Sequence, residues 1–161
     1  GPVFMRTGRS PIDPCLPENY QFAFGKGKVV HEGHDITVIG CGVTTGRAIR
    51  AAQNLKQEGV SVRVVNLSTI KPIDKDIIVE SAEKTGHIIT VEDHNIYGGL
   101  GSAVAEVLSQ ERPTPLKILG VMDIFGESGE PDELAEKYGI SETVIQQSIL
   151  TVMKKKKAVF A

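Results

Sequence analysis

The amino-acid sequence predicts an α/β domain in which a parallel β-sheet is covered by helices on both faces. Short apolar segments alternate with segments of about 10–15 residues whose apolar positions follow helical spacing, as in parallel α/β folds. The short segments are apolar at nearly every position, which is typical of strands buried on both faces. The 161 residues suffice for one hydrophobic core and are too few for two comfortable ones.

The expected strands and helices follow one another in a regular order. Strands are predicted over residues 28–31, 36–41, 60–67, 87–91 and 116–121. Helices are predicted over residues 44–58, 75–85, 99–109 and 131–138, with a last helix after residue 141. Gly59 and Gly86 suit the left-handed positions after two helices, and Pro131 suits a first helical turn. Asp74 and Ser141 are expected to cap the helices that follow them.

The first 27 residues differ from the rest. Residues 3–5 predict a short buried strand, and the prolines at 11, 14 and 17 predict a linker over residues 6–27. A buried strand with nothing beside it to pair with indicates that a preceding part of the chain is missing. The alternative is a tag remnant at Gly1-Pro2 followed by a true domain start.

Composition excludes several classes of protein. The 18 basic and 20 acidic residues give a formal net charge of −2, whereas a general nucleic-acid or membrane-surface binder would be more basic. No apolar run approaches the roughly 18–20 residues that span a bilayer. Cys15 and Cys41 form neither a disulfide framework nor a metal-binding pattern, which favours a reducing cytoplasm and no metal site. The lysines at 154–157 predict a solvated helix end within a basic tail, residues 154–161.

A glycine-rich turn, Gly40 to Gly46, follows the second predicted strand and opens a helix. Backbone N–H groups at such a position favour an anion. However, the spacing G-x-G-x-x-x-G is one residue longer than the dinucleotide fingerprint, and the acidic residue expected after the next strand is replaced by Asn66 and Ser68. A tight turn that needs small residues is therefore the favoured interpretation. The Cys41 thiol in this turn is expected to be buried and inert.

A second cluster of candidate site residues follows the strand predicted over residues 87–91. It comprises Glu92, Asp93, His94, Gly98, Gly99, Gly101 and Ser102. Charged groups at the carboxyl end of a buried strand lie where α/β sheets bind ligands, so a catalytic carboxylate–histidine pair, an anion site or a metal site is conceivable. The alternative is a capping and turn cluster at a subunit interface.

A third candidate, residues 6–10, places Arg6 and Arg9 beside hydroxyl groups and a glycine. Guanidinium groups bind phosphate oxygens in a bidentate manner. The alternative is a solvated exit from a strand.

Several segments occur in a characteristic order: GPVFMRTGR, GKGKVVHEGHDITVIGCG, VVNLSTIKPID, HIITVEDHNIYGGLGSAVAEVL and GEPDELAEKYGIS. Together they resemble the C-terminal domain of transketolase over about residues 1–153, with IKPID and TVEDHNIYGGLGS the most specific. The C-terminal domain of 1-deoxyxylulose-5-phosphate synthase is nearly as similar.

The resemblance implies a three-layer α/β/α sandwich with a five-stranded, mostly parallel sheet. One strand would be antiparallel, most naturally residues 28–31, which no helix follows. Residues 1–27 would be the last strand and exit linker of a preceding pyrimidine-binding domain, and residues 28–153 the C-terminal domain itself. In a complete enzyme, the N-terminal and pyrimidine-binding domains would hold thiamine diphosphate and a divalent metal (Mg or Ca). The diphosphate motif of the family is absent here.

Among the site residues, the resemblance assigns a substrate-phosphate contact to Arg9 and none to Arg6. It assigns no catalytic step to residues 92–94 or 98–102, so a structural role there is preferred. The leading hypothesis is a non-catalytic part of a homodimeric two-carbon transferase. A naturally split enzyme is disfavoured, because its subunit would be expected to include the pyrimidine-binding domain. A stand-alone module that binds a small anion at residues 40–46 or 99–102 is the remaining alternative.

Overall fold

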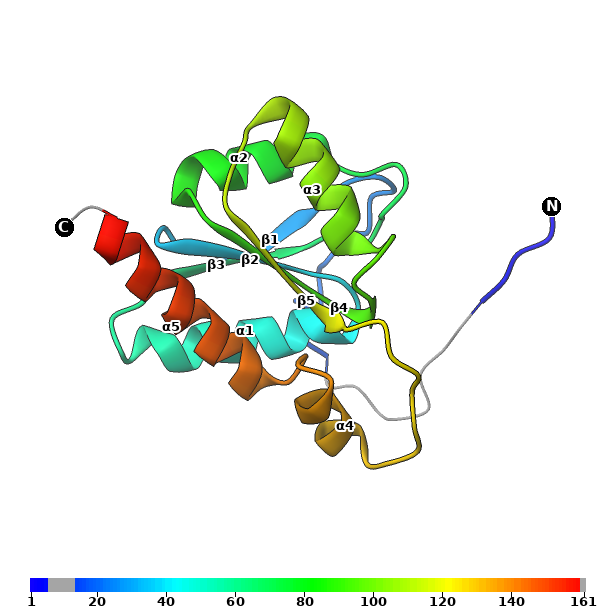
Figure 1. Ribbon diagram of the computed structural model, residues 1–161. Coiled ribbons are helices and arrows are strands. Elements are labelled where there is room, and N and C mark those ends of the chain that lie inside the picture. Colours follow the sequence, from blue (N-terminus) through cyan, green and yellow to red (C-terminus); the bar gives the residue numbers. More distant parts are fainter. Residues whose placement is uncertain (6–13, 160–161) are drawn as a thin grey trace.

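The computed structural model describes residues 1–5 and 14–159 (Figure 1). The strands are β1 (Lys28–His31), β2 (Ile36–Gly40), β3 (Val62–Asn66), β4 (Ile88–Asn95) and β5 (Leu116–Val121). The helices are α1 (Val43–Lys56), α2 (Lys75–Thr85), α3 (Leu100–Glu111), α4 (Pro131–Lys137) and α5 (Glu142–Val159). None of these helices is long and apolar enough to cross a lipid bilayer.

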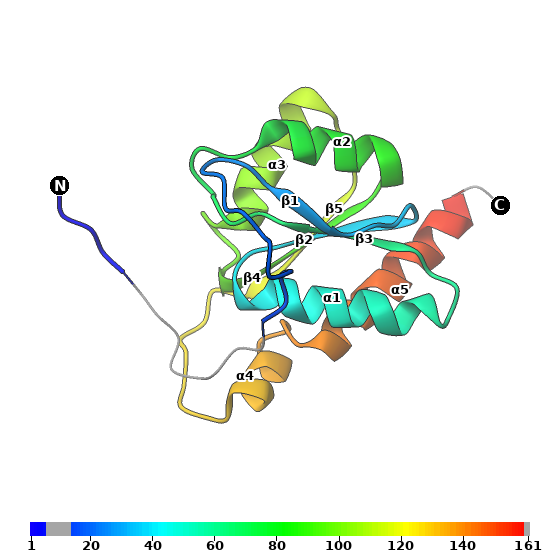
Figure 2. The same ribbon diagram turned by 180° about the vertical axis from the view of Figure 1, so that it is seen from behind.

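The strands form one five-stranded sheet in the order β1-β3-β2-β4-β5. β1 runs antiparallel to β3, and every other neighbouring pair is parallel. Helices α1 and α5 cover one face of the sheet, and α2 and α3 cover the other (Figures 1 and 2). The three-layer architecture with one antiparallel strand, at residues 28–31, is therefore confirmed.

Each face of the sheet carries its own hydrophobic core. On one face Leu55 of α1 and Ile149 of α5 pack against strands β2 and β3, and all of these side chains are fully buried. On the other face Ile78 of α2 and Val104 of α3 pack against Ile39. The continuously apolar strands are thus explained, because both of their faces are covered.

The residues predicted to cap or end the helices do so, except for Asp74. Gly59 and Gly86 have φ of +78° and +69°, and the Ser141 hydroxyl accepts a hydrogen bond from the Val144 N–H (3.1 Å). Asp74 occupies the N-cap position of α2, but its side chain does not cap the helix. Instead its carboxylate accepts a hydrogen bond from the Gly27 N–H (2.9 Å) and thereby fastens the entering segment to α2.

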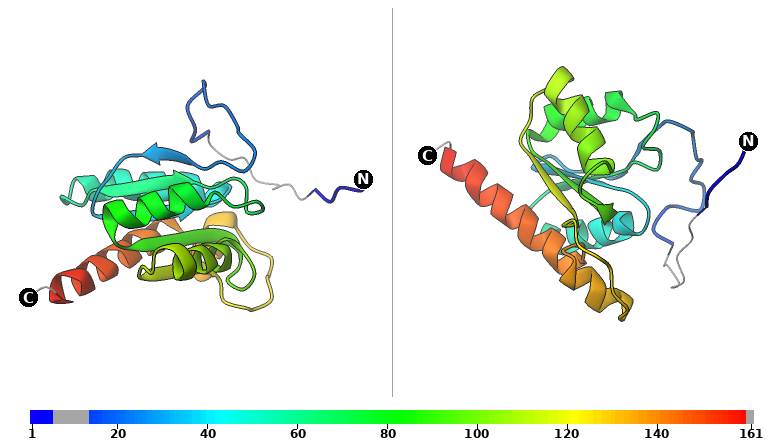
Figure 3. Two further views of the ribbon diagram at one scale, coloured as in Figure 1. Left: turned by 90° about the horizontal axis from the view of Figure 1, so that it is seen from above. Right: turned by 45° about the vertical axis from the view of Figure 1, so that its right-hand side comes forward.

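The strand predicted over residues 3–5 is not formed in this structure, and its assignment to a preceding domain stays a prediction. Val3, Phe4 and Met5 form no strand and are exposed. A strand is stabilised by a hydrogen-bonded neighbour, and no described strand pairs with these residues. The predicted boundary at residue 154 is also not a structural break, because α5 continues to Val159. Residues 1–5 and the carboxyl end of α5 lie on opposite sides of the molecule (Figure 3).

Arg63 lies inside β3 with a fully buried side chain, although its neighbours in the strand are valines. Its guanidinium donates to Glu32 (2.8 Å) and Glu80 (2.9 Å), and the latter also pairs with Lys84. The Lys84 hydrogen bond is the largest cause that lowers the pKa of Glu80, with Arg63 adding to it. The Arg63 side chain thus extends from the buried strand toward the surface beside α2, where two carboxylates pair with its guanidinium group.

The end of α5 is attached to the amino edge of the sheet by Lys156. Its ammonium group donates to the backbone carbonyls of Asp35 and Thr85, each at 3.0 Å. His87 lies beside this contact, and its Nδ1 is buried without a hydrogen-bond partner. Burial, and then the nearby charge of Lys156, lower the pKa of His87 from its ordinary value of 6.5.

We expect the free energy of unfolding to depend on pH through His87. Because its pKa is lower in the folded chain, the unfolded chain binds the proton more readily, and stability falls as pH falls below about 6.5. In urea titrations, His87→Gln should lose less stability than wild type between about pH 7.5 and pH 5. Above about pH 7.5 the difference between the two proteins should stay constant, which is the internal control. Equal losses in both proteins would contradict this assignment.

Candidate functional site

The candidate residues from three parallel strands meet at the carboxyl edge of the sheet. Helix α1, which follows β2, lies on one face, and α3, which follows β4, lies on the other, so the chain diverges between these adjacent strands. Ligands of open α/β sheets bind at such a divergence. Here the Thr44 hydroxyl, at the start of α1, donates to the carbonyl of Val91 (2.7 Å) and links the start of α1 to β4.

Glu92 is the central residue of this edge. Its side chain is buried, and its two carboxylate oxygens accept hydrogen bonds from the N–H groups of Leu100 (2.7 Å) and Gly101 (2.8 Å). These are the first residues of α3, whose N–H groups have no partner within the helix. The negative charge is also favoured by the helix dipole. Glu92 therefore occupies the position that an external anion would take at Gly99–Ser102.

The glycines next to Glu92 are required by close contacts. A Cβ on Gly99 would lie 2.1 Å from a carboxylate oxygen of Glu92, and a Cβ on Gly101 would lie 2.5 Å from Ile118. The Gly98 N–H donates to the Ser102 hydroxyl (2.9 Å). These contacts explain why small residues precede and open α3, and three N–H groups of the turn, those of Gly98, Leu100 and Gly101, already have acceptors within the chain.

His94 does not form a hydrogen-bonded pair with Glu92. Its Nδ1 lies 3.8 Å from the carboxylate but 2.8 Å from the Asn95 carbonyl, and its side chain is exposed. Asp93 is exposed as well. Both residues belong to β4, which extends to Asn95 rather than ending at residue 91 as predicted. The extension arises because Asn95 pairs with Val121 of β5 after an irregularity in the ladder.

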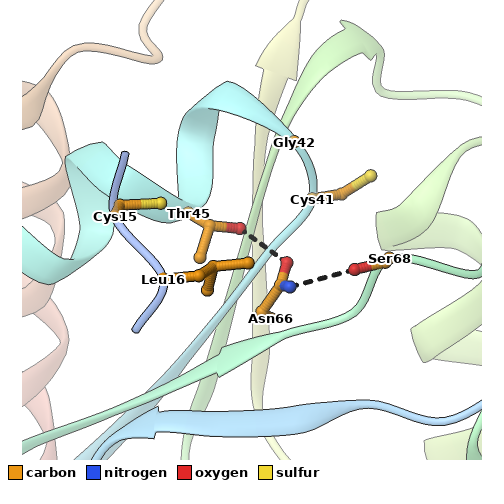
Figure 4. A pocket seen from close by; sticks show the side chains of 7 residues that line it. All are labelled: Cys15, Leu16, Cys41, Gly42, Thr45, Asn66 and Ser68. Atoms are coloured by element: carbon orange, nitrogen blue, oxygen red, sulfur yellow. Dashed lines mark hydrogen bonds between the residues drawn. The ribbon is translucent and has the colours of Figure 1, made fainter. Parts of the chain in front are cut away.

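The glycine-rich turn borders a pocket of about 280 Å³ (Figure 4). Its lining residues are Cys15, Leu16, Cys41, Gly42, Thr45, Asn66 and Ser68. Within it the Thr45 hydroxyl donates to the Asn66 amide oxygen (3.0 Å), and the amide nitrogen donates to the Ser68 hydroxyl (2.9 Å). The polar groups thus form a chain among themselves, and none of the lining side chains is charged at neutral pH.

The two cysteines belong to this pocket in different ways. Cys15 packs near Gly46, and a Cβ on Gly46 would lie 3.5 Å from the Cys15 sulfur. The Cys41 side chain points away from Cys15 (Figure 4). Burial, and then the charge of Glu92, raise the pKa of the Cys41 thiol. The raised pKa disfavours the reactive thiolate, as expected for an inert thiol, although the residue is only partly buried.

The sequence analysis did not bring Cys15, Leu16 and Ser68 together with the glycine-rich turn. The position of Cys15 and Leu16 depends on the path of residues 14–27, which no local motif predicts. One available signal was the pair Asn66 and Ser68 at the end of β3, because side chains at that edge of a parallel sheet face the same turn. Arg9 lies outside the described residues, so its assignment stays a prediction.

The described residues do not fit a metal-bound diphosphate cofactor. No group of three or more His, Cys, Asp or Glu side chains within residues 1–5 and 14–159 could hold a metal ion. The N-terminus of α3 is already neutralised by Glu92, and the pocket at α1 provides no cation. The site is thus an internally hydrogen-bonded edge of an α/β domain.

Comparison with known proteins identifies the family. A family model described as "Transketolase, C-terminal domain" matches residues 25–145. The chain therefore belongs to the transketolase C-terminal domain family.

Several relatives span nearly the whole chain. A 6-deoxy-6-sulfo-D-fructose transketolase subunit from Clostridium sp. (strain MSTE9) is 39% identical over 97% of this chain and 48% of its own length. A putative transketolase C-terminal section from Methanocaldococcus jannaschii is 42% identical over 96% of this chain and 49% of its own length. Mouse transketolase is 40% identical over 92% of this chain and 24% of its own length. The chain thus spans about half the length of the first two relatives and about a quarter of the third.

A solved structure described as "Split gene transketolase, inactive beta4 tetramer" has the same fold. It superimposes with a TM-score of 0.86 at 43% identity, covering 91% of this chain and 48% of the other. Because these relatives carry transketolase names, the alternative of a 1-deoxyxylulose-5-phosphate synthase domain is not favoured.

We expect Glu92→Gln to destabilise the domain by about 1–2 kcal/mol, because a charged acceptor at a helix N-terminus is replaced by a neutral one. Urea denaturation measures the change, and the amide NMR shifts of Leu100 and Gly101 report the loss locally. Glu106→Gln, at an exposed carboxylate of the same helix, is the matched control and should change stability by less than about 0.5 kcal/mol. Equal effects of the two substitutions would contradict the role given to Glu92.

Proposed function

We propose that this chain is the C-terminal domain of a thiamine-diphosphate-dependent transketolase, which transfers a two-carbon ketol unit between sugar phosphates. In this role it supports assembly of the enzyme and performs no catalytic step alone. The observation that supports the role most directly is the buried carboxylate of Glu92 on the N-terminus of α3. It leaves the usual ligand position of the fold occupied by the chain itself.

In this proposal, the N-terminal and pyrimidine-binding domains hold thiamine diphosphate and its divalent metal, Mg or Ca. When bound, the cofactor supplies the carbanion chemistry of ketol transfer. This chain contributes a rigid domain next to those parts, and its surfaces keep them in position. The small-anion module is not favoured, because Glu92 already occupies the N-terminus of α3 and no lysine, arginine or histidine lines the pocket at α1.

The partners in this proposal are the other domains of the same enzyme and a second copy of it. The relatives described as a subunit and as a C-terminal section support a function completed by other polypeptide segments. The related tetramer is itself built from copies of a chain that contains this fold, which supports a homodimer or larger assembly. Two free cysteines within the described residues support a cytoplasmic location.

We expect the purified 161-residue chain to show no ketol transfer with sugar phosphates, thiamine diphosphate and Mg²⁺. The reason is that the described residues provide neither a metal-ligand cluster nor a catalytic pair. A coupled spectrophotometric assay measures turnover, and a complete transketolase in the same assay is the positive control. Calorimetry with thiamine diphosphate and Mg²⁺ should likewise detect no binding. Turnover by the pure chain would overturn the proposal.

We also propose that Arg9 contacts the substrate phosphate in the assembled enzyme. A hydrogen bond to a charged group contributes about 1.5–3 kcal/mol, so Arg9→Ala should raise KM for a phosphorylated substrate at least about tenfold. Steady-state kinetics of the complete enzyme measures this change, and a non-phosphorylated substrate should be unaffected. Arg6→Ala is the matched control. If both substitutions had the same effect, Arg9 would have no specific role.

A further inference from the structure

Four large apolar side chains are exposed on two loops at the carboxyl edge of the sheet. Tyr97, between β4 and α3, is 68% exposed. Met122, Ile124 and Phe125, between β5 and α4, are 64%, 56% and 99% exposed. We call these four residues the carboxyl-edge patch. The second loop projects outward from the sheet in each view (Figures 1 and 2). Exposed apolar clusters of this kind mark interaction surfaces.

The two loops that carry the patch are joined by hydrogen bonds. The Ile96 N–H donates to the Val121 carbonyl (3.0 Å), and the Asn95 amide donates to the Asp123 carboxylate (2.7 Å). The Tyr97 N–H in turn donates to the Asn95 side chain (2.8 Å). These bonds hold the backbone next to the apolar side chains, so the patch is presented by loops with a defined relative position.

The electrostatics of the patch are strongly one-sided. Between Lys117 and Lys137 the sequence contains six carboxylates and no lysine or arginine. Two of the six are paired, Glu127 with Lys137 (2.5 Å) and Asp132 with Arg47 (3.8 Å). Asp123 accepts a hydrogen bond from the neutral amide of Asn95, which leaves its negative charge in place. The segment from β5 through α4, which carries three of the four patch residues, is therefore acidic, and its carboxylates are called the acidic rim.

We propose that the carboxyl-edge patch docks an apolar protein surface whose rim carries lysine or arginine residues. A basic rim would meet the acidic rim with complementary charge while the apolar centres are buried together. A second copy of this chain is disfavoured as the occupant, because a two-fold interface would place the patch against itself and bring the carboxylates together. In the assembly proposed above, this partner surface belongs to another part of the enzyme. That identification of the partner rests on the proposed function, whereas the docking surface itself does not.

The test uses two synthetic peptides with the same apolar centre, Leu-Phe-Leu, flanked by two lysines or by two glutamates on each side. NMR titration of the labelled chain measures affinity and maps the contact. We expect the lysine-flanked peptide to bind at least about tenfold more tightly, to shift the amides of Tyr97, Ile124 and Phe125, and to weaken as salt is raised. No binding, equal binding of both peptides, or shifts elsewhere on the chain would overturn the proposal.

A pair of variants makes the test specific. Ile124→Ser with Phe125→Ser removes apolar surface from the patch, and we expect binding of the lysine-flanked peptide to be lost. Phe22→Ser with Phe24→Ser removes comparably exposed apolar surface elsewhere (61% and 71% exposed) and should leave binding unchanged. Circular dichroism checks that both variants fold. Sedimentation measures whether the wild-type chain associates with itself. Self-association that is lost in the Ile124→Ser, Phe125→Ser variant would show that the occupant is a second copy, which would overturn the proposal. Neither result depends on ketol-transfer activity.

Discussion

The carboxylate of Glu92 on the N-terminus of α3 is the interaction on which the carboxyl edge depends. A buried charge is costly unless it is hydrogen-bonded, and here two backbone N–H groups provide the hydrogen bonds. The bonds fix how α3 leaves β4, and they require glycine at position 99 because a Cβ would collide with the carboxylate. The same charge contributes to the raised pKa of the Cys41 thiol, so it also influences the turn after the neighbouring strand.

This arrangement explains how a fold that places ligands at its carboxyl edge can serve an assembly role. The helix N-terminus that would attract a phosphate is neutralised from within, and the polar groups of the neighbouring pocket bond to one another. At the same edge, the loops after β4 and β5 are joined to each other by a hydrogen bond, and both loops expose apolar side chains. At α3, the edge therefore presents apolar side chains and an internally bonded carboxylate rather than an open anion site.

The sequence pattern indicated that the charged residues and glycines after β4 would lie at the carboxyl edge of the sheet, but their pairing with one another was not predictable. Charged residues after a buried strand and glycines before a helix indicated where the edge would be. Nothing in the order Glu92, Asp93, His94 states that the first side chain points inward to α3 while the histidine lies outside. That outcome follows from β4 continuing to Asn95 alongside β5, and strand extension depends on a partner 26 residues away (Asn95 with Val121). The same limitation applies to Asp74, whose side chain bonds to Gly27 rather than capping α2.

The sequence by itself determined the α/β class, the five strands of the sheet between residues 28 and 121, the helix ends near Gly59 and Gly86, and the resemblance to the transketolase C-terminal domain. These features depend on periodicity, on backbone preferences of single residues and on contiguous motifs, all of which are local. Only the tertiary structure decided which polar groups satisfy one another: Glu92 with α3, Arg63 with Glu32 and Glu80, and Lys156 with the carbonyls of Asp35 and Thr85. Those pairings join segments that meet only after the sheet has formed, because a buried polar group takes the partner that the packed fold brings within reach.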